Sequence, residues 1–455
     1  MKSIWIEITQ YCNRRCAYCF SADKLTANKK EITLADFDTL LDYCEKEGIS
    51  EVHLMGGEPT THSGFQVLLK KLRARGFCYV LLTNGMFDTR LIDEFALDSG
   101  SHIFVNLNHP DTFDNREQWE LVNRNIKELS ERKIDVGLGY NIYEEQPDYG
   151  FFIEAIKKYN IEIARWDLAR PSTNFKNRHF CIHDFFRMIP VFAGFIKECM
   201  KAGVGFNFDC PMPTCMWLNS EFNFVNGGIC FSTRAFCGPE MLIEPDLRIA
   251  TCPAAGLIFE DIYLTDFALV SQAQRFVNYY AEQLRSSKWV LKECEDCVHR
   301  VLRECQGGCL GHKRGNEIKR IDKKDLEKFL SGPIDTNNFA IGKISAEGIK
   351  RANEKYRIEI ARGNKTVYNY YSLARASEAA EKYDAAIEYY RAALEADPGH
   401  MPSKHRLDLS YQLKAVKENP NNVAAWNRLK TVLHTIIYPP EMVKEELHRY
   451  VMKYK

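Results

Sequence analysis

Short apolar runs alternate with amphipathic segments along the first half of the chain. The apolar runs are rich in β-branched and aromatic residues, which is typical of strands. They are Ile4–Thr9, Glu51–Met55, Tyr79–Thr83, Ile103–Leu107, Ile134–Asn141 and Ile161–Leu168. Between them, apolar residues recur at helical spacing in Leu34–Glu47, Phe65–Arg75, Arg90–Leu97, Trp119–Arg132 and Phe151–Tyr159. This alternation predicts an α/β fold with a parallel sheet, either open or closed towards a barrel, with its chemistry at the C-terminal ends of the strands.

The pattern changes after Gly203. Residues 207–253 are rich in Cys, Pro, Gly and aromatic residues, which favours a loop-rich region held together by metal. Gln272–Trp289 is predicted to be a helix, and residues 314–344 are interpreted as a linker. We therefore predict domains at 1–206, 207–313 and 345–455, separated by that linker.

The segment 345–455 contains no cysteine and is dominated by Ala, Glu, Lys, Tyr and Leu, which predicts an all-α domain. In a 34-residue frame counted back from Pro398, large and small residues fall where tetratricopeptide repeats place their packing residues. These are Tyr370, Leu373, Ala374, Ala386, Tyr390 and Ala393. Asn419-Pro420 with Trp426 and Leu429 resembles a second, degenerate repeat. A plain helical bundle packed on the rest of the protein fits equally well.

Composition narrows the class of protein. The 455 residues include 61 Lys+Arg, 61 Asp+Glu, 45% apolar residues and 16 cysteines. The apolar content argues against disorder, and zero net charge without a local basic patch argues against nucleic-acid binding. The N-terminus, with Glu7 inside its apolar stretch, resembles neither a signal peptide nor a membrane span. We therefore expect a cytoplasmic protein without a membrane partner, in which grouped cysteines bind metal instead of forming disulfides.

The first cysteine group, Cys12, Cys16 and Cys19, directly follows the first predicted strand. Three thiolates leave one iron of a four-iron cluster open. This C-x3-C-x2-C loop, with Tyr18 before its last cysteine, resembles that of the radical S-adenosylmethionine (SAM) enzymes, and Gly56-Gly57-Glu58-Pro59-Thr60 after the second strand resembles their GGEPT segment. A zinc knuckle beside an ordinary glycine-rich turn is the alternative.

The resemblance implies a partial (β/α)6 barrel of the TIM type and reductive cleavage of SAM to a 5'-deoxyadenosyl radical. Tyr18 is then expected beside the adenine, and Gly56 and Gly57 let the backbone approach the cofactor. Glu58 offers an acceptor for the ammonium group, with Pro59 in the same segment. For Asn106 and Asn141, at strand ends, binding of the cofactor and hydrogen bonding to loop backbone are equally compatible with the sequence.

The later cysteines resemble the SPASM extension of radical enzymes that modify peptides. By that resemblance, one auxiliary [4Fe-4S] cluster is bound by Cys230, Cys237, Cys252 and Cys309, and three corners of a second by Cys294, Cys297 and Cys305. The family usually supplies the last ligand downstream, and this chain has no cysteine after Cys309.

Three explanations stay open for the missing ligand: Cys210 or Cys215, a residue such as His312 or a carboxylate, or an open iron. We favour a non-cysteine or open position. One or two zinc sites are the alternative to the clusters. Four further cysteines are expected to be ordinary buried thiols: Cys44, Cys78, Cys181 and Cys199.

Three functions follow. The first is hydrogen abstraction from a peptide or protein, giving a crosslink, thioether, epimer or oxidised side chain, with a flavodoxin or ferredoxin as reductant. The chain begins at the first barrel strand without a leader-recognition domain, so the C-terminal helices are expected to bind the peptide or a partner through tyrosines such as Tyr368, Tyr370, Tyr371, Tyr383 and Tyr389.

The second function is the same radical chemistry on a small molecule. The third is an iron–sulfur electron carrier or scaffold. Cys210, Cys215 and Arg170 are candidate catalytic residues.

Overall fold

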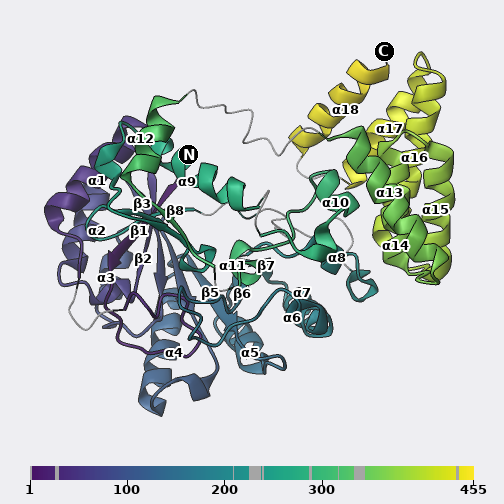
Figure 1. Cartoon of the computed structure of the whole chain (residues 1–455). Coiled ribbons are helices and arrows are strands. Elements are labelled where there is room, and N and C mark those ends of the chain that lie inside the picture. The colour runs from purple at the N-terminus through teal and green to yellow at the C-terminus, as the bar shows by residue number, and fades with distance from the viewer. Residues whose placement is uncertain are drawn as a thin grey trace. The chain divides into compact units, whose positions relative to one another are not determined.

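The structure of the chain is a computed structural model (Figure 1). The structure describes residues 3–25, 30–208, 210–224, 237, 240–285, 289–315, 317–332, 344–436 and 440–454. The chain divides into two compact units. The barrel unit comprises Met1–Pro211, Ser232–Trp289 and Cys309–Ala340, and the helical unit comprises Met212–Phe231, Val290–Gly308 and Ile341–Lys455.

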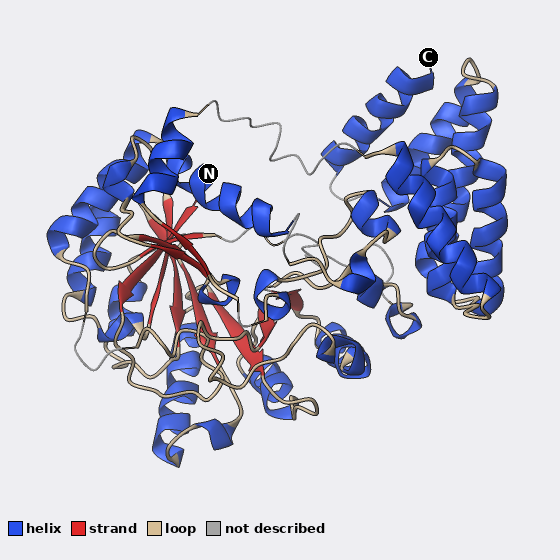
Figure 2. Ribbon diagram, viewed as in Figure 1, coloured by secondary structure: helices blue, strands red, loops and turns tan. Residues whose placement is uncertain are grey.

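A nine-stranded sheet forms the centre of the barrel unit. Its order is β7-β6-β5-β4-β3-β2-β1-β8-β9, and every neighbouring pair is parallel except β8–β9. The strands are β1 (Ser3–Thr9), β2 (Glu51–Gly56), β3 (Cys78–Thr83), β4 (His102–Asn106), β5 (Val136–Ile142), β6 (Ile163–Leu168), β7 (Gly205–Phe208), β8 (Met241–Ile243) and β9 (Ile249–Thr251). Figure 2 shows them as a curved fan with helices on its outer face. The predicted α/β fold with a partial barrel is confirmed.

The crossover helices bury their apolar faces against this sheet. They are α1 (Leu34–Lys46), α2 (Phe65–Ala74), α3 (Leu91–Phe95), α4 (Arg116–Glu131), α5 (Gly150–Lys158), α6 (Asp184–Arg187) and α7 (Ile189–Lys201). Side chains of Thr33 and Asn115 cap the N-termini of α1 and α4 by accepting hydrogen bonds from backbone N–H groups. In α1, Phe37, Leu40 and Leu41 are fully buried, as their helical spacing predicts.

The segment interpreted as a linker is partly folded. Lys319–Ile321 forms β11, which pairs in parallel with β10 (Leu257–Phe259), and α12 spans Lys323–Ser331. Asp322 and Asp325 form a capping box at the start of α12. The predicted helix Gln272–Trp289 contains α9 (Val270–Gln283), which begins two residues earlier than expected, and residues 286–288 of the prediction lie outside the described residues. The linker interpretation was therefore wrong for Lys319–Ser331, where charged residues belong to a surface helix and not to a connection.

Helices of the C-terminal segment form most of the helical unit. They are α13 (Ala346–Ala361), α14 (Val367–Ala379), α15 (Tyr383–Ala396), α16 (Met401–Glu418), α17 (Val423–Ile436) and α18 (Pro440–Tyr454), and each packs on the next. Of the six proposed repeat residues, five are buried and Tyr370 is half-buried. This burial agrees with helical hairpin packing, while assignment to the tetratricopeptide family stays a prediction.

The helical unit also includes segments from the cysteine-rich region. α8 (Thr214–Trp217) is followed by Leu218, which packs into an apolar cluster with Tyr371, Ala374 and Tyr390. α10 (Val298–Val301) contributes Val298 to a second cluster with α13 and α14. The predicted domain 207–313 is therefore divided between the two units, because part of it needs the helices to bury its apolar side chains; α11 (Leu310–Lys313) belongs to the barrel unit.

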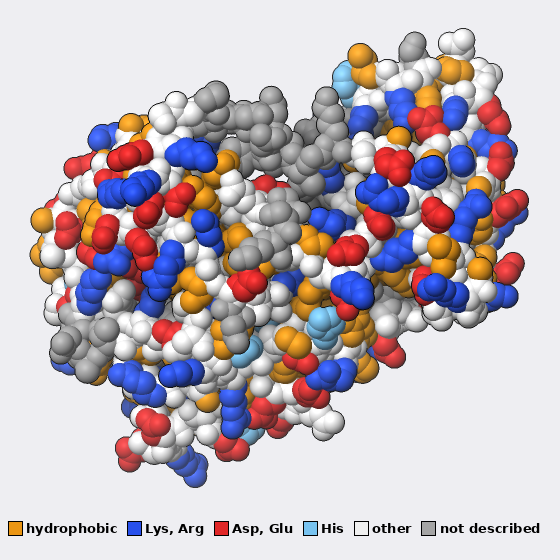
Figure 3. Space-filling model, in the orientation of Figure 1, with side chains coloured by type: hydrophobic (Ala, Val, Ile, Leu, Met, Phe, Trp, Pro, Cys, Tyr) orange, Lys and Arg blue, Asp and Glu red, His pale blue; other side chains and the backbone are white. Residues whose placement is uncertain are grey.

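The surface carries both signs of charge. On the face seen in Figure 3, blue and red side chains are interspersed over both units. Among the described helices, none has the length and apolar character required to cross a membrane.

Candidate active site

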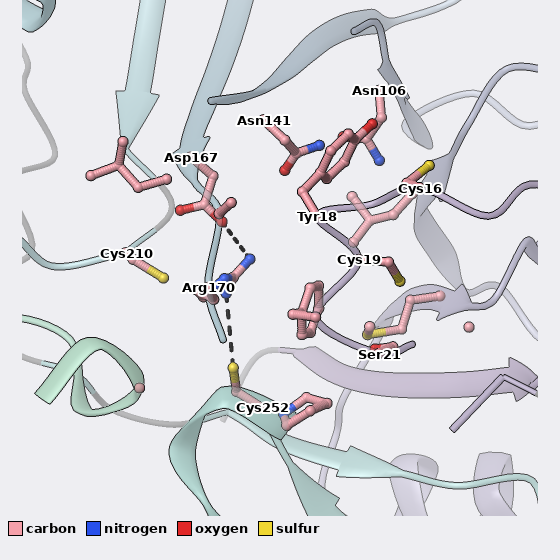
Figure 4. A pocket seen from close by; sticks show the side chains of 18 of the residues that line it. Cys16, Tyr18, Cys19, Ser21, Asn106, Asn141, Asp167, Arg170, Cys210 and Cys252 are labelled. Atoms are coloured by element: carbon pink, nitrogen blue, oxygen red, sulfur yellow. Dashed lines mark hydrogen bonds and ion pairs between the residues drawn. The ribbon is translucent and has the colours of Figure 1, made fainter. Parts of the chain in front are cut away.

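A cavity of 270 Å³ lies in the barrel unit, at the C-terminal ends of the strands. Residues from the ends of β2, β3, β4, β5 and β6 line it, together with the loop after β1. The C-terminal edge of a parallel sheet is where its loops converge, so the cavity has the position expected for an active site. Figure 4 shows part of its lining.

The cysteine loop after β1 forms one wall. Cys12, Cys16 and Cys19 all line the cavity. Burial raises the pKa of Cys12 to about 11 and that of Cys19 to about 12, and the neighbouring thiols add to both shifts. Backbone N–H of Arg14 donates to Cys12 Sγ at 3.4 Å. Thiols such as Cys12 and Cys19, which resist ionisation in a buried loop, match a site that becomes thiolate when a cation binds.

Gly56 and Gly57 lie against the same loop. A Cβ on Gly56 would be 2.3 Å from the Thr9 carbonyl oxygen, and one on Gly57 would be 2.1 Å from that of Tyr11. Gly57 N–H also donates to Thr9 O at 2.8 Å. The glycines line the cavity, as predicted, but the structure also shows that they allow the end of β2 to pack against the chain that leads into the cysteine loop.

Glu58 is buried and joins two strand ends. Its carboxylate accepts hydrogen bonds from Thr60 Oγ1 and Thr83 Oγ1, each at 2.7 Å, and from Asn84 N–H at 2.7 Å. Burial raises the pKa of Glu58, although these donors oppose the shift. Glu58 lines the cavity, whereas Pro59 is buried and is absent from its lining. The carboxylate therefore fixes the loops, and binding of an ammonium group stays a prediction.

Tyr18, Asn106 and Asn141 lie together in the cavity, as Figure 4 shows. The Tyr18 ring stacks on Tyr143 with centroids 4.8 Å apart. Neither the Asn106 nor the Asn141 side-chain amide makes a hydrogen bond with another described residue. The alternative that these amides serve loop backbone therefore gains no support, and both groups remain available to a ligand.

Arg170 connects two parts of the lining. It forms an ion pair with Asp167, at the end of β6, and its Nη1 lies 3.9 Å from Cys252 Sγ (Figure 4). Its guanidinium also lies 4.6 Å from the Phe20 ring centroid. A cation held between a carboxylate and a thiol is suited to stabilise negative charge on that sulfur or on a ligand.

Four cysteines of the barrel unit form what we call the barrel thiol set: Cys210, Cys237, Cys252 and Cys309. All four line the cavity. The thiols of Cys210 and Cys237 raise the pKa of Cys309, and the Cys309 thiol lowers that of Cys237 to about 6. Cys230, predicted as a ligand here, lies outside the described residues. Among the described cysteines, Cys210 is therefore the fourth member of this set.

Four cysteines of the helical unit form a second group, the helical thiol set: Cys215, Cys294, Cys297 and Cys305. Burial raises the pKa of Cys215, and the other three thiols raise it further. Backbone N–H groups of Thr214 and Gly307 donate to Cys305 Sγ at 3.3 and 3.2 Å. Sequence analysis favoured a non-cysteine or open position here; the structure instead brings Cys215, from upstream of the motif, to the other three thiols.

No three His, Cys, Asp or Glu side chains within the described ranges are arranged so that they could hold a metal ion as they stand. The thiol sets are groups of neighbours whose exact ligand geometry would form on binding. His312 is buried in the barrel unit, its Nδ1 donates a hydrogen bond to Phe180 O at 2.6 Å, and its ring packs on Phe185. It is thus a core histidine and does not accompany the helical thiol set.

The cysteines expected to be ordinary buried thiols differ from one another. Cys44 and Cys199 are fully buried, Cys78 is half-buried and Cys181 is exposed, so the expectation was wrong for Cys181. Its side chain lies at the surface because the chain enters the short α6 there, where Asp184 caps the backbone N–H of Cys181 at 2.7 Å.

Several cavity residues were missed by sequence analysis. Asn84, Asn108 and Asp167 line the cavity at or just after the ends of β3, β4 and β6. Asn84 Nδ2 donates to Asn13 Oδ1 at 2.7 Å, which ties the cysteine loop to β3. The signal that would have found them is their place at predicted strand ends.

Comparisons with known proteins agree with this geometry. Residues 6–148 match the model of the radical SAM superfamily. PqqA peptide cyclase of Xanthomonas campestris pv. campestris is 31% identical over 84 residues, 18% of this chain and 22% of that protein. A probable GTP 3',8-cyclase of Methanothermobacter thermautotrophicus is 28% identical over 140 residues, 30% of this chain and 45% of that protein.

The chain thus spans less than half the length of these curated relatives. Among solved structures, SuiB of Streptococcus suis bound to S-adenosylmethionine aligns with a TM-score of 0.42 at 15% identity, over 56% of this chain and 60% of that chain. Residues 6–148 include Cys12, Cys16, Cys19 and Gly56–Glu58, so the superfamily match covers the residues that carried the resemblance.

Proposed function

We propose that this protein cleaves SAM reductively and uses the resulting radical to abstract hydrogen from a peptide or protein, installing a post-translational modification. One observation carries the proposal. A single cavity is lined by Cys12, Cys16 and Cys19 on one side and by the barrel thiol set on another. Such an arrangement suits two steps. The first cysteine group would serve radical generation, and the barrel thiol set would serve removal of an electron from the substrate radical.

The protein's own residues have separable roles in this proposal. Cys12, Cys16 and Cys19 would hold a [4Fe-4S] cluster with an open iron, and that group would supply the electron for reductive cleavage of SAM to methionine and a 5'-deoxyadenosyl radical. The Tyr18 ring offers a flat apolar surface, and the free amides of Asn106 and Asn141 offer donors and acceptors to the cofactor. These groups orient the cofactor before any chemistry occurs.

The two thiol sets are proposed to hold auxiliary [4Fe-4S] clusters, one in each unit. Four soft thiolates are the ligands that such clusters require. Cys210 and Cys215 complete the two sets, so we assign them as ligands and not as catalytic residues. Arg170 is proposed to neutralise charge near Cys252, and Asp167 to keep Arg170 in place.

The first test measures 5'-deoxyadenosine. After anaerobic reconstitution with iron and sulfide, protein with SAM and a strong reductant should release it, and Cys16→Ala should reduce release to background. Cys181→Ala is the matched control, because this exposed cysteine lies outside the cavity. Equal release from wild type and Cys16→Ala would refute the proposal.

A small-molecule substrate is the second candidate, favoured by the similarity to a probable GTP 3',8-cyclase. The test uses separate reactions, each with reconstituted enzyme, SAM and a reductant. One set contains peptides encoded beside the gene, and the other contains GTP. A mass change in a peptide supports the first proposal. Consumption of GTP, with no peptide modified, supports the second. If neither the peptide reactions nor the GTP reaction releases 5'-deoxyadenosine, the electron-carrier interpretation is favoured.

The helical unit and the partners complete the proposal. Tyr371 and Tyr383, suggested by the sequence as peptide contacts, are buried in apolar clusters, so a peptide would contact other side chains of the helices. A flavodoxin or ferredoxin is proposed as reductant, and the cytoplasm as location, because thiolate ligands need a reducing compartment.

A further inference from the structure

Two tyrosines of the C-terminal helices lie beside the helical thiol set. Tyr368 is on α14, and its hydroxyl oxygen lies 3.7 Å from Cys297 Sγ. Tyr356, on α13, is 2% exposed, and its hydroxyl lies 3.4 Å from that of Tyr368. Tyr356 and Cys297 are buried and Tyr368 is half-buried, so the two phenols and the thiol form a largely shielded chain of hydrogen-bonding groups within one unit.

We propose that Tyr368, held in place by Tyr356, donates a hydrogen bond to the Cys297 thiolate and thereby raises the reduction potential of the auxiliary cluster in the helical unit. This inference rests on the proposed binding of a cluster by the helical thiol set. The C-terminal helices then act as a positioning element for electron transfer, besides any role in binding a partner.

The direction of the hydrogen bond follows from the chemistry of the groups. A thiolate that binds iron has no proton, so it can only accept. A phenol is protonated near neutral pH, so the Tyr368 hydroxyl, 3.7 Å from Cys297 Sγ, can donate. Tyr356 can donate to the Tyr368 oxygen, which leaves the Tyr368 proton directed at sulfur.

The effect on potential follows from charge. Reduction adds one negative charge to the cluster and its thiolates, and a donor to a ligand sulfur stabilises that added charge. The effect is strong at this position, because Cys297 is 9% exposed and water competes little for its sulfur. Removing the donor should therefore make the cluster harder to reduce.

The same helices hold the loop that carries Cys297 and Cys305. Arg375 of α14 forms ion pairs with Glu304 and with Glu378, and His299 Nδ1 lies 2.8 Å from Glu304 Oε2. Gly348 of α13 packs on Val301. These contacts fix α10 and the following loop against α13 and α14, so the tyrosine hydroxyls have a defined position relative to the sulfur.

The experiment is a redox titration of the reconstituted full-length protein at fixed pH, monitored by electron paramagnetic resonance. The signal of the helical-unit cluster is first identified as the one that Cys297→Ala removes. Tyr368→Phe should shift its midpoint to more negative values, and Tyr356→Phe should shift it less in the same direction. Tyr371→Phe is the matched control, because this buried α14 tyrosine stacks on His299 and should leave the midpoint unchanged.

A second measurement keeps the inference testable if Tyr368→Phe folds poorly. Pulsed resonance of the wild-type protein exchanged into heavy water should reveal an exchangeable proton coupled to this cluster, and Tyr356→Phe should alter that coupling. Unchanged midpoints in Tyr368→Phe and Tyr356→Phe with full iron content, or no coupled proton, would overturn the inference alone. Equal iron content in wild type and Cys297→Ala would instead overturn the proposed helical-unit cluster.

Discussion

The two thiol sets have the same number of cysteines in contrasting surroundings. All four cysteines of the barrel thiol set line the cavity, and the Arg170–Asp167 ion pair lies beside Cys252. The helical thiol set does not line that cavity and has tyrosine hydroxyls and backbone N–H groups as neighbours. The first environment suits contact with substrate, and the second suits storage or passage of an electron.

The contrast extends to what holds each set. Cys210 and Cys252 follow strands of the barrel unit and Cys309 directly precedes its helix α11, and the core of this unit is an apolar sheet with helices. The helical thiol set depends on a buried charge network around Arg375. A substitution in the Arg375 network should therefore affect the helical thiol set and leave the barrel thiol set intact.

The largest effect is expected for Arg375→Met. The Arg375 side chain is 8% exposed and pairs with Glu304 and Glu378, so its loss removes a buried cation and leaves Arg406 to neutralise both carboxylates. Breaking such a buried pair costs about 3–5 kcal/mol. We expect the helical unit to unfold at lower urea concentration and to lose its iron, measured by urea titration and iron analysis of the full chain.

Arg391→Met is the matched control for this prediction. Arg391 lies exposed on α15 near Tyr411, so its replacement should change stability by less than about 0.5 kcal/mol. Equal urea midpoints for the two variants would show that the Arg375 network does not support the helical unit.

The two units should lose stability at different pH values when the protein is acidified. Burial lowers the pKa of His312, in the barrel unit, to about 4. The pKa of His312 in the folded state lies below the unfolded value near 6.5, so its contribution to the free energy of unfolding is complete above pH 6.5. This contribution is lost as the pH falls towards 4, and the loss is at most about 3 kcal/mol. Thermal unfolding between pH 7 and pH 4.5 should show the barrel unit weakening, and His312→Gln should flatten that slope.

The helical unit should respond at lower pH. Burial opposes ionisation of Glu304, but Arg375, His299 and Arg406 outweigh it and hold the pKa of Glu304 below its usual range. A depressed carboxyl pKa contributes stability that is lost only as the pH falls below the unfolded value of about 4.3. Simultaneous loss of both units near pH 6 would contradict this difference.

A smaller effect is expected for Asp167→Asn. Without the carboxylate, Arg170 loses the partner that orients it towards Cys252. Misplacing a positioning group costs about tenfold or more in rate. We expect modified product per 5'-deoxyadenosine to fall about tenfold, while Arg178→Lys, in an exposed ion pair with Glu144, should leave that ratio unchanged. If Asp167→Asn leaves the ratio of modified product to 5'-deoxyadenosine unchanged, the Asp167–Arg170 pair has a structural role only.

Much of the barrel could be predicted from sequence. The strands β1 to β6 begin and end within two residues of the expected bounds, because each is an apolar run flanked by a helix with clear periodicity. β8 and β9 were missed, since three-residue strands carry too little pattern. α12 was hidden by its charged surface, although its capping box was visible in the sequence.

The site was predictable where its residues are close in sequence. Cys12, Cys16 and Cys19 share one loop, so their spacing alone brings them together. Cys215 and Cys297 are far apart along the chain, and only the packing of α8 and α10 with the C-terminal helices places them in one unit. Spacing therefore could not decide between Cys215, His312 and an open iron.

The central claim is that the two thiol sets each hold a four-iron cluster besides that of the radical loop. The most direct measurement is iron and sulfide content after anaerobic reconstitution of wild type, Cys210→Ala, Cys215→Ala and Cys181→Ala. We predict about twelve irons per chain in wild type and Cys181→Ala, since each [4Fe-4S] cluster holds four. Each of the other variants should have a weakened or lost cluster and a lower count. About four irons in wild type, unchanged in every variant, would contradict the account.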